Sequence, residues 1–391
     1  MINKRIFLIP VLFLLTMFYS CSDSPSSIGN NLLSPDYVNV NKIDSYQDSI
    51  GQSSSDYKTQ VQLSDSPRLL VGKFNNVVAS TLMRFAIFLP DSLKQAVLGS
   101  TLNILSARVD LVKEYNIGTS TGSLNYTVHF VHNTWTALYN ADSLSLLDYD
   151  PADISSNKSS IDSLYSFELD NQTISSWLNA ASDTSVKTNN GIYIKPDTTG
   201  ADRIVGFDAY NVNAIGLPTL TIVVSESGNV DTLKYISLPD VSILTGDKPV
   251  LPSGDIAVQA GLAVDARVKF DLSFLQKGAI VNKAQFTVYL DSSATKTGDT
   301  YTNSIVAYFA KDSSDTAYDT TSGIVLNRDG NTFTGNIARF IQSIASGYHD
   351  NNGFILAAGG QNIAVDLFAL KGSDAAETSL RPRLVIIYTG K

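Results

Sequence analysis

The chain has 391 residues, a formal net charge of −9 and charged side chains at 17% of its positions. This length is enough for two domains that each bury a core of their own. The acidic balance, without a local Lys/Arg cluster, repels phosphate groups and therefore argues against nucleic acid as a partner.

The first 20 residues have the anatomy of a signal peptide. Lys4 and Arg5 precede a largely apolar stretch from Ile6 to Tyr19, which is shorter than the roughly 20 apolar residues that span a bilayer. Cys21 is the single cysteine and follows Ser20 directly. This placement resembles the lipobox of bacterial lipoproteins, which implies a lipidated Cys21 and anchoring at the outer membrane or cell surface. The alternative is a plain secretory signal followed by a spare thiol.

Residues 21–65 predict a lipidated polar tether. They are rich in Ser, Asn, Asp and Gly, and their apolar runs are as short as the one from Tyr37 to Val40. Such a composition offers little apolar surface to bury, although the segment could still contribute one edge strand. Beyond residue 65, apolar residues alternate at period 2 in many short runs separated by turn residues. This pattern predicts an all-β fold.

Residues 66–224 and 232–391 show the same features in the same order. Each half has alternating strands, then apolar residues at helical spacing, then Asn-Asn-Gly, and last a proline before an apolar strand. The helical spacing is that of Ile174, Trp177, Leu178 and Ala181 in the first half and of Ile337, Phe340, Ile341 and Ile344 in the second. The recurrence predicts a duplicated β-sandwich, with one short helix in each domain and a linker from Ser225 to Asp231.

The Asn-Asn-Gly triplet occupies residues 189–191 and again residues 351–353. Asn and Gly tolerate positive φ, so the triplet predicts a tight turn that sets the register of the buried strand after it.

This order of features resembles the DNRLRE family of exported domains. The resemblance rests on an Arg/Lys-Phe strand, a Trp-bearing segment, a short helix, Asn-Gly and a terminal Pro-x-Leu strand. It implies two tandem jelly-roll-like β-sandwiches, at 66–224 and 232–391, of a kind that occurs beside, or as, polysaccharide-binding modules. The stretch "CSDSPSSIGNNLLSPDYVNV" also resembles uncharacterised surface lipoproteins of Bacteroidetes-type bacteria.

Motifs that carry catalysis or bind cofactors are missing from the sequence. It contains no His-Glu-x-x-His spacing, no Cys ligand set, no Gly-x-Ser-x-Gly elbow and no P-loop. We therefore expect no catalytic residues and no cofactor, with a structural calcium ion left open. The candidate calcium ligands are Asp148, Asp150 and Asp153, whose alternation places several oxygens along one loop. The alternative is a solvated polar turn at Pro151.

Sugar binding needs a flat aromatic surface beside hydrogen-bonding groups. Trp135, Tyr139, Tyr149 and Tyr165 are the candidate rings, because all four lie in or beside a long polar insertion that the second half lacks. The alternative is that they are ordinary aromatic residues of a β protein.

These features predict a non-catalytic, lipid-anchored cell-surface protein that binds an extracellular polymer, with polysaccharide as the expected ligand. Two alternatives stay open. One is a structural or adhesive module that contacts a partner surface protein through a sheet edge. The other is a glycan-cleaving enzyme with its carboxylates in a cleft between the halves.

Overall fold

The computed structural model describes residues 39–60, 63–120, 124–183, 185, 189–199, 202–210, 216–312 and 317–390. The predicted signal peptide 1–20, the lipidation at Cys21 and the tether up to residue 38 lie outside the described residues. Within the described part, antiparallel strands dominate and the three α-helices are short. No helix in this part is long and apolar enough to cross a membrane.

The first half runs from residue 68 to residue 245. Its elements are β3 (Arg68–Phe74), β4 (Val77–Phe85), α2 (Asp91–Leu98), β5 (Asn103–Gly118), β6 (Tyr126–Phe130), the 3₁₀ turn η2 (Asp142–Leu146), β7 (Ser155–Ile161), β8 (Leu164–Leu169), α3 (Asn171–Ser182), β9 (Ile192–Pro196), β10 (Arg203–Asp208), β11 (Thr219–Glu226) and β12 (Asn229–Thr245).

The second half combines the C-terminal strands with two strands from the start of the described chain. Its elements are β1 (Asn39–Asp44), β2 (Gln52–Lys58), β13 (Asp255–Gln259), β14 (Val264–Phe270), β15 (Ile280–Tyr289), β16 (Ser304–Ala310), β17 (Tyr318–Asp329), β18 (Thr332–Asn336), α4 (Ala338–Ala345), β19 (Phe354–Ala358), β20 (Leu367–Lys371), the 3₁₀ turn η3 (Thr378–Leu380) and β21 (Arg383–Gly390).

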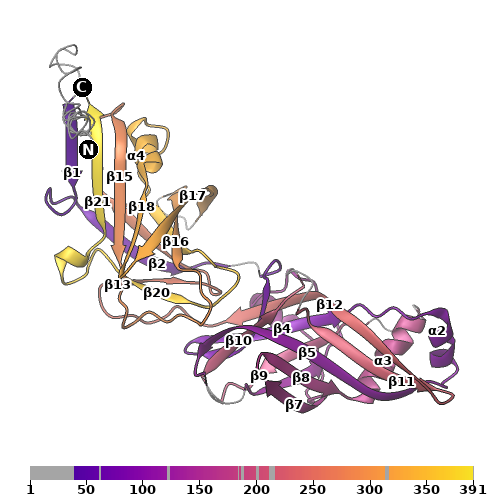
Figure 1. Ribbon diagram of the computed structural model, residues 1–391. Coiled ribbons are helices and arrows are strands. Elements are labelled where there is room, and N and C mark those ends of the chain that lie inside the picture. The colour runs from indigo at the N-terminus through magenta and orange to yellow at the C-terminus, as the bar shows by residue number, and fades with distance from the viewer. Residues whose placement is uncertain are drawn as a thin grey trace, which may run out of the picture.

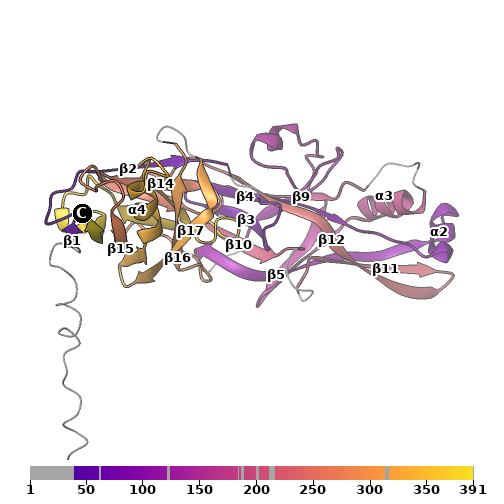
Figure 2. The same cartoon turned by 90° about the horizontal axis from the view of Figure 1, so that it is seen from above.

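Each half is one hydrogen-bonded antiparallel sheet that curls into a sandwich, and the two halves follow one another along a long molecule (Figures 1 and 2). In the first half β10 pairs with both β3 and β5, which brings the two layers together. The predicted all-β fold of two tandem jelly-roll-like sandwiches is confirmed.

The strand pairings repeat from one half to the other. β9 lies between β4 and β6 as β19 lies between β14 and β16. β5 lies between β8 and β11 as β15 lies between β18 and β21. The helix that precedes each Asn-Asn-Gly lies at the predicted place, as α3 in the first half and α4 in the second. The repeated sequence features therefore correspond to repeated structure.

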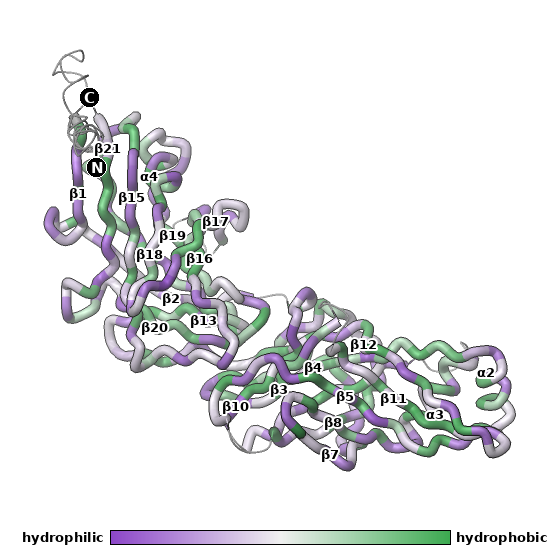
Figure 3. The backbone as a smooth tube through the Cα atoms, viewed as in Figure 1, coloured by the Kyte–Doolittle hydropathy of each residue, from purple (hydrophilic) through white to green (hydrophobic). Residues whose placement is uncertain are grey.

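Apolar residues form two clusters inside these sheets, and Figure 3 shows the hydrophobic strands that carry them. One cluster fills the first sandwich and contains Phe167, Trp177 and Phe207. The other fills the second sandwich, with Phe286 and Phe354 among its residues, and continues onto the outer face of the first half's sheet. Both faces of that sheet are therefore buried near the junction.

The junction is held by hydrogen bonds as well as by apolar packing. Tyr115 of β5 is fully buried, and its hydroxyl donates to Asp366 Oδ1 at 3.1 Å. Beside it, the backbone N–H of Asn116 donates to Asp299 Oδ1 at 2.7 Å. Desolvation raises the pKa of Tyr115, so this hydroxyl stays protonated and keeps its role as a donor.

Two predicted connections differ from the structure. The segment from Ser225 to Asp231, predicted as the linker, is the end of β11, a two-residue turn and the start of β12. Polar residues at a hairpin tip have the same composition as a linker, and the long pairing of β12 with β4 lies beyond the reach of local patterns. The chain crosses to the second half only after Thr245.

The tether prediction, which left one edge strand open, is also wrong for residues 39–58, because this segment forms two strands: β1 pairs with β21 and β2 pairs with β14. We call this segment, β1 with β2 and the residues between them, the arm. Its strand character comes from partners more than 200 positions away, so its own polar composition does not reveal it. A helix not expected from the sequence, α2, buries Leu93 and Ala96 and packs against α3.

Candidate functional site

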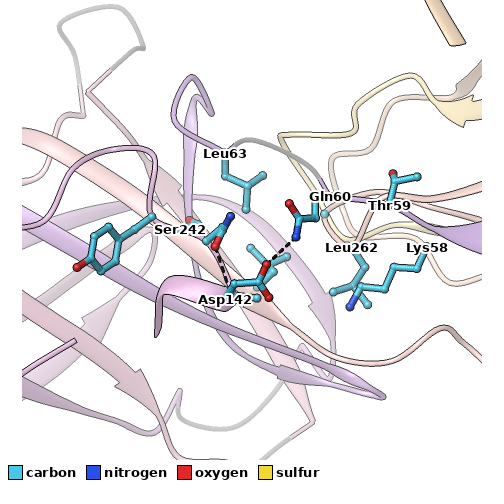
Figure 4. A pocket seen from close by; sticks show the side chains of 12 residues that line it. Lys58, Thr59, Gln60, Leu63, Asp142, Ser242 and Leu262 are labelled. Atoms are coloured by element: carbon cyan, nitrogen blue, oxygen red, sulfur yellow. Dashed lines mark hydrogen bonds between the residues drawn. The ribbon is translucent and has the colours of Figure 1, made fainter. Parts of the chain in front are cut away.

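A cavity of about 300 Å³ lies between the two halves (Figure 4). Segments far apart in the sequence line it: the end of the arm, the insertion between β6 and β7 (residues 131–154), β12, and the turn between β13 and β14. The lining residues are Lys58, Thr59, Gln60, Leu63, Tyr139, Asn140, Ala141, Asp142, Ser242, Leu244, Gly261 and Leu262. Clefts between domains are a preferred place for ligand sites, and pockets for small ligands start at about this volume.

Polar side chains from both sides meet in this cavity. Gln60 Nε2 donates to Asp142 Oδ2 at 2.6 Å, a bond visible as a dashed line in Figure 4. Lys58 Nζ donates to the carbonyl of Gly246 at 2.6 Å. Both bonds lie at exposed positions, so a ligand that offers hydroxyl groups finds accessible donors and acceptors here.

Tyr139 is the one predicted ring that lines the cavity. It comes from the insertion, where Asn133 Nδ2 donates to its hydroxyl at 3.4 Å. The ring is half-buried, and Leu63 and Leu262 provide apolar surface in the same cavity. An aromatic face beside polar groups is the arrangement that sugar rings require.

Trp135, the first of the candidate rings for sugar binding, does not face outward. Trp135 is 2% exposed, and its indole N–H donates to the carbonyl of Asn190 at 2.7 Å. The insertion folds over the outer face of the first half's sheet, where Trp135 packs with Val131 and Leu147 in the apolar cluster that crosses the junction. An insertion rich in polar residues thus covers a sheet face, and its buried aromatic and aliphatic side chains make the apolar contact with that face.

The other two predicted rings lie apart from the cavity lining. Tyr149 is half-buried, and its ring centre lies 5.1 Å from those of His129 and Tyr193. Tyr165 of β8 is 7% exposed and packs edge-on against Phe207 inside the first sandwich. The four predicted rings therefore do not form one exposed platform.

Two of the three aspartates of the predicted calcium loop are held by separate protein partners. Asp150 Oδ1 pairs with His132 Nε2 at 2.8 Å, while Asp148 is exposed. Asp153 accepts from the backbone of Val128 at 3.0 Å and pairs with Lys158 at 2.7 Å. Burial raises the pKa of Asp153, but these bonds outweigh it and lower that pKa overall. Across the described residues, no group of three or more His, Cys, Asp or Glu side chains is placed to hold a metal ion.

The carboxylate with the largest upward pKa shift lies in the second half, away from the cavity. Asp265 of β14 is fully buried, and burial raises its pKa to about 7. Gln361 Nε2 donates to its Oδ1 at 2.7 Å, whereas Oδ2 has no hydrogen-bond partner among the described residues. Because the folded protein holds this proton more tightly than the unfolded chain, the stability of the fold depends on pH.

We expect the free energy of unfolding to fall as pH rises from about 4 to about 7, the window in which the folded state binds the extra proton. Asp265→Asn is expected to flatten this slope and to be more stable than the wild type at pH 8 by about 2–4 kcal/mol. Denaturant unfolding of both proteins at pH 5 and pH 8 measures the difference. Asp329→Asn, at the exposed end of β17, serves as the control and should keep the pH dependence of the wild type. The prediction would be contradicted if the stability of Asp265→Asn changed with pH as steeply as that of the wild type.

Sequence patterns indicated only Tyr139 of this cavity, through the insertion that carries it. Lys58, Gln60 and Ser242 come from segments whose strands pair over long distances, and none belongs to a motif. No local signal in the sequence points to them.

No protein-family model matches this chain, and no curated protein does either. Among solved structures, the C-terminal domain of the AgI/II polypeptide BspA from Streptococcus agalactiae aligns over 86% of this chain and 89% of that chain, at 11% identity and a TM-score of 0.18. The C-terminal domain of the antigen I/II-family protein AspA from Streptococcus pyogenes aligns over 88% and 92%, at 12% identity and a TM-score of 0.15. At such TM-scores these alignments carry no argument about function.

Proposed function

We propose that this chain is a lipid-anchored, non-catalytic protein of the outer membrane or cell surface that binds an extracellular polysaccharide in the cavity between its two halves. The observation that carries the proposal is the meeting of Tyr139 with polar side chains of both halves around one cavity. Tyr139 offers a ring face to the C–H groups of a sugar, while Gln60 and Asp142 offer partners for its hydroxyls.

The cavity favours binding over hydrolysis. Glycosidases generally use two carboxyl groups about 5–10 Å apart. Asp142 is the one carboxylate among the described lining residues, and its Oδ2 accepts a hydrogen bond from Gln60.

The test is affinity electrophoresis of the chain from Ser22 to Lys391 in gels that contain different polysaccharides. We expect retention by at least one polysaccharide, and we expect Tyr139→Ala and Asp142→Ala each to weaken it at least tenfold, about 1.4 kcal/mol of binding free energy. Tyr348→Ala serves as the matched control, because Tyr348 is 80% exposed and lies beyond α4, outside the cavity lining. Retention that both cavity variants leave unchanged would overturn the proposed site.

A partner protein is the second candidate ligand, favoured by exposed apolar residues at the α2 end of the first half. Phe88 is 78% exposed, Leu98 54% and Leu238 39%, and a groove runs beside Phe88 and Leu238. This end lies opposite β1 and the end of β21 along the molecule (Figures 1 and 2). If the folded chain is retained by no polysaccharide, this candidate replaces the first, and loss of partner binding in Phe88→Ser would support it.

A further inference from the structure

The two halves are completed by different parts of the chain. In the first half, β12 pairs first with β11 and then with β4, so that it links one layer of the sandwich to the other. In the second half the arm takes this place: β1 pairs with β21, and β2 pairs with β14. β12 is the last strand, in sequence, of the half that it completes, whereas the arm lies in the sequence before the whole first half.

The equivalence extends to the register. The first Asn of each Asn-Asn-Gly makes the same contact. Asn189 Nδ2 donates to the carbonyl of Phe85 in the first half, and Asn351 Nδ2 donates to the carbonyl of Phe270 in the second. Ser237 of β12 lies opposite Phe85, and Gln52 of the arm lies opposite Phe270. The chain direction is antiparallel in every one of these pairs, so the arm is the structural counterpart of β12.

The arm is held mainly through its backbone and polar side chains. Asp44 is 1% exposed and accepts from Arg383 Nε at 3.0 Å, an ion pair that lowers the pKa of Asp44. Ser54 Oγ accepts from the backbone N–H of Ser373 at 2.8 Å, and Asp56 Oδ2 accepts from that of Ala257 at 2.8 Å.

Few apolar side chains help to hold the arm. Among its described residues, none belongs to the fully buried apolar residues of the core, and Ile50 is partly buried beside them. By contrast, β12 buries Val241, Ile243 and Leu244. Figure 3 shows β1 as a hydrophilic strand beside the hydrophobic β21. Release of the arm therefore exposes polar groups that water can satisfy, while it uncovers two strand edges of the second half.

An identical arm fits these uncovered edges best, because its register and polar contacts are already matched to them. In the sequence the arm is joined to the first half through residues 59–67, and among the described residues its strands pair only with β21 and β14, so its release breaks no strand pairing of the first half. Exchange of identical segments keeps every contact and is a low-cost route to assembly.

We propose that the arm of one chain completes the second half of another, so that copies of this protein assemble by strand exchange. Within one chain, the effective concentration of the arm near its own second half is in the millimolar range, as is usual for segments joined by short linkers. The monomer therefore dominates in dilute solution, and exchanged species grow as the protein concentration approaches that range.

A disulfide trap tests this in the full mature chain with Cys21→Ser. Ser53 of β2 lies opposite Lys269 of β14, and cross-strand Cα atoms at such a pair are close enough for a disulfide. One variant carries Ser53→Cys and a second carries Lys269→Cys. The two variants are mixed, unfolded in guanidinium, refolded together and then oxidised. Refolding is done at about 10 µM and at about 500 µM, so that one sample lies far below the millimolar range and the other close to it.

We expect a disulfide-linked dimer that contains one chain of each variant. At the higher concentration this dimer should be at least tenfold more abundant than the dimer in a control mixture of Ser53→Cys with Lys94→Cys. Lys94 lies on α2, which belongs to the first half. The double variant Ser53→Cys, Lys269→Cys should cross-link within one chain in dilute solution, which establishes that the pair has disulfide geometry.

Two results would overturn the proposal. One is a double variant that cross-links internally while the mixture gives no more dimer than the control at the higher concentration. The other is a folded double variant that does not cross-link at all, since the arm then does not occupy the edge of β14. Asp44→Ala, which removes the ion pair with Arg383, should make the dimer form several-fold faster when folded variants are mixed without denaturant, because the arm is released more easily.

Discussion

Replacing Gly191 with alanine is expected to destabilise the first half by about 2–5 kcal/mol. Gly191 has a φ of +77°, and a Cβ atom at this position would lie 2.0 Å from the carbonyl oxygen of Met83 on β4. A positive φ costs a residue with a side chain about 1–2 kcal/mol, and the overlap with backbone atoms adds about 1–3 kcal/mol. The overlap cannot relax by rotation of a side chain, because it involves the strand that β9 pairs with.

The second copy provides a matched experiment. Gly353 has a φ of +85°, and its Cβ would lie 2.7 Å from the carbonyl oxygen of Val268. Gly353→Ala is therefore expected to destabilise the second half, by less than Gly191→Ala destabilises the first. Gly228→Ala is the control: its φ is +83°, but nothing lies within 4 Å of the added Cβ. It should lose only the conformational part, about 1–2 kcal/mol.

Guanidinium unfolding followed by circular dichroism measures all three variants. Equal losses in Gly191→Ala and Gly228→Ala would mean that the close approach to β4 plays no part. The repeated Asn-Asn-Gly is then a turn signal alone, and its third position is free to accept any residue that tolerates positive φ.

The repeat was predictable because its signals are local. The spacing of Ile174, Trp177 and Leu178 marks an amphipathic helix, and the structure places these three side chains in the core. The cap is local too: Asp170 accepts from the backbone N–H of Thr173 at 2.7 Å. Such features need only a few neighbouring residues, and they recur whenever the unit is duplicated.

The strands that complete each half were not predictable in this way. β12 pairs with β4 across more than 150 positions, and β2 pairs with β14 across more than 200. The polar residues of the arm alternate in no clear pattern, because their burial depends on backbone pairing and on partners such as Arg383.

The cavity was equally hidden, because it arises where these strands end. Lys58 is the last residue of β2 and Gln60 follows that strand, while Ser242 belongs to β12. The predicted insertion therefore indicated one wall of the site, through Tyr139, and left the opposite wall unknown. Trp135 shows the converse error: a residue in a polar segment was expected at the surface, but the segment itself covers an apolar sheet face.

Replacing Trp177 with alanine is expected to cost about 3–5 kcal/mol of the free energy of unfolding, while Trp177→Phe should stay within about 1 kcal/mol of the wild type. Trp177 is 1% exposed, and its ring centre lies 6.2 Å from that of Phe85. Its indole N–H is buried without a hydrogen-bond partner among the described residues. Phenylalanine keeps most of the ring volume and removes the unpaired donor, so the two effects offset one another.

The second half already contains this substitution, since Phe340 holds the equivalent place on α4 and is 2% exposed. Unfolding by guanidinium, with the fluorescence of the remaining Trp135 as a probe near the junction, measures both variants. A loss in Trp177→Phe as large as in Trp177→Ala would contradict the prediction. It would mean that the indole's shape, rather than its apolar volume, holds α3 on the sheet, and that the two copies of the sandwich have diverged in how their helices pack.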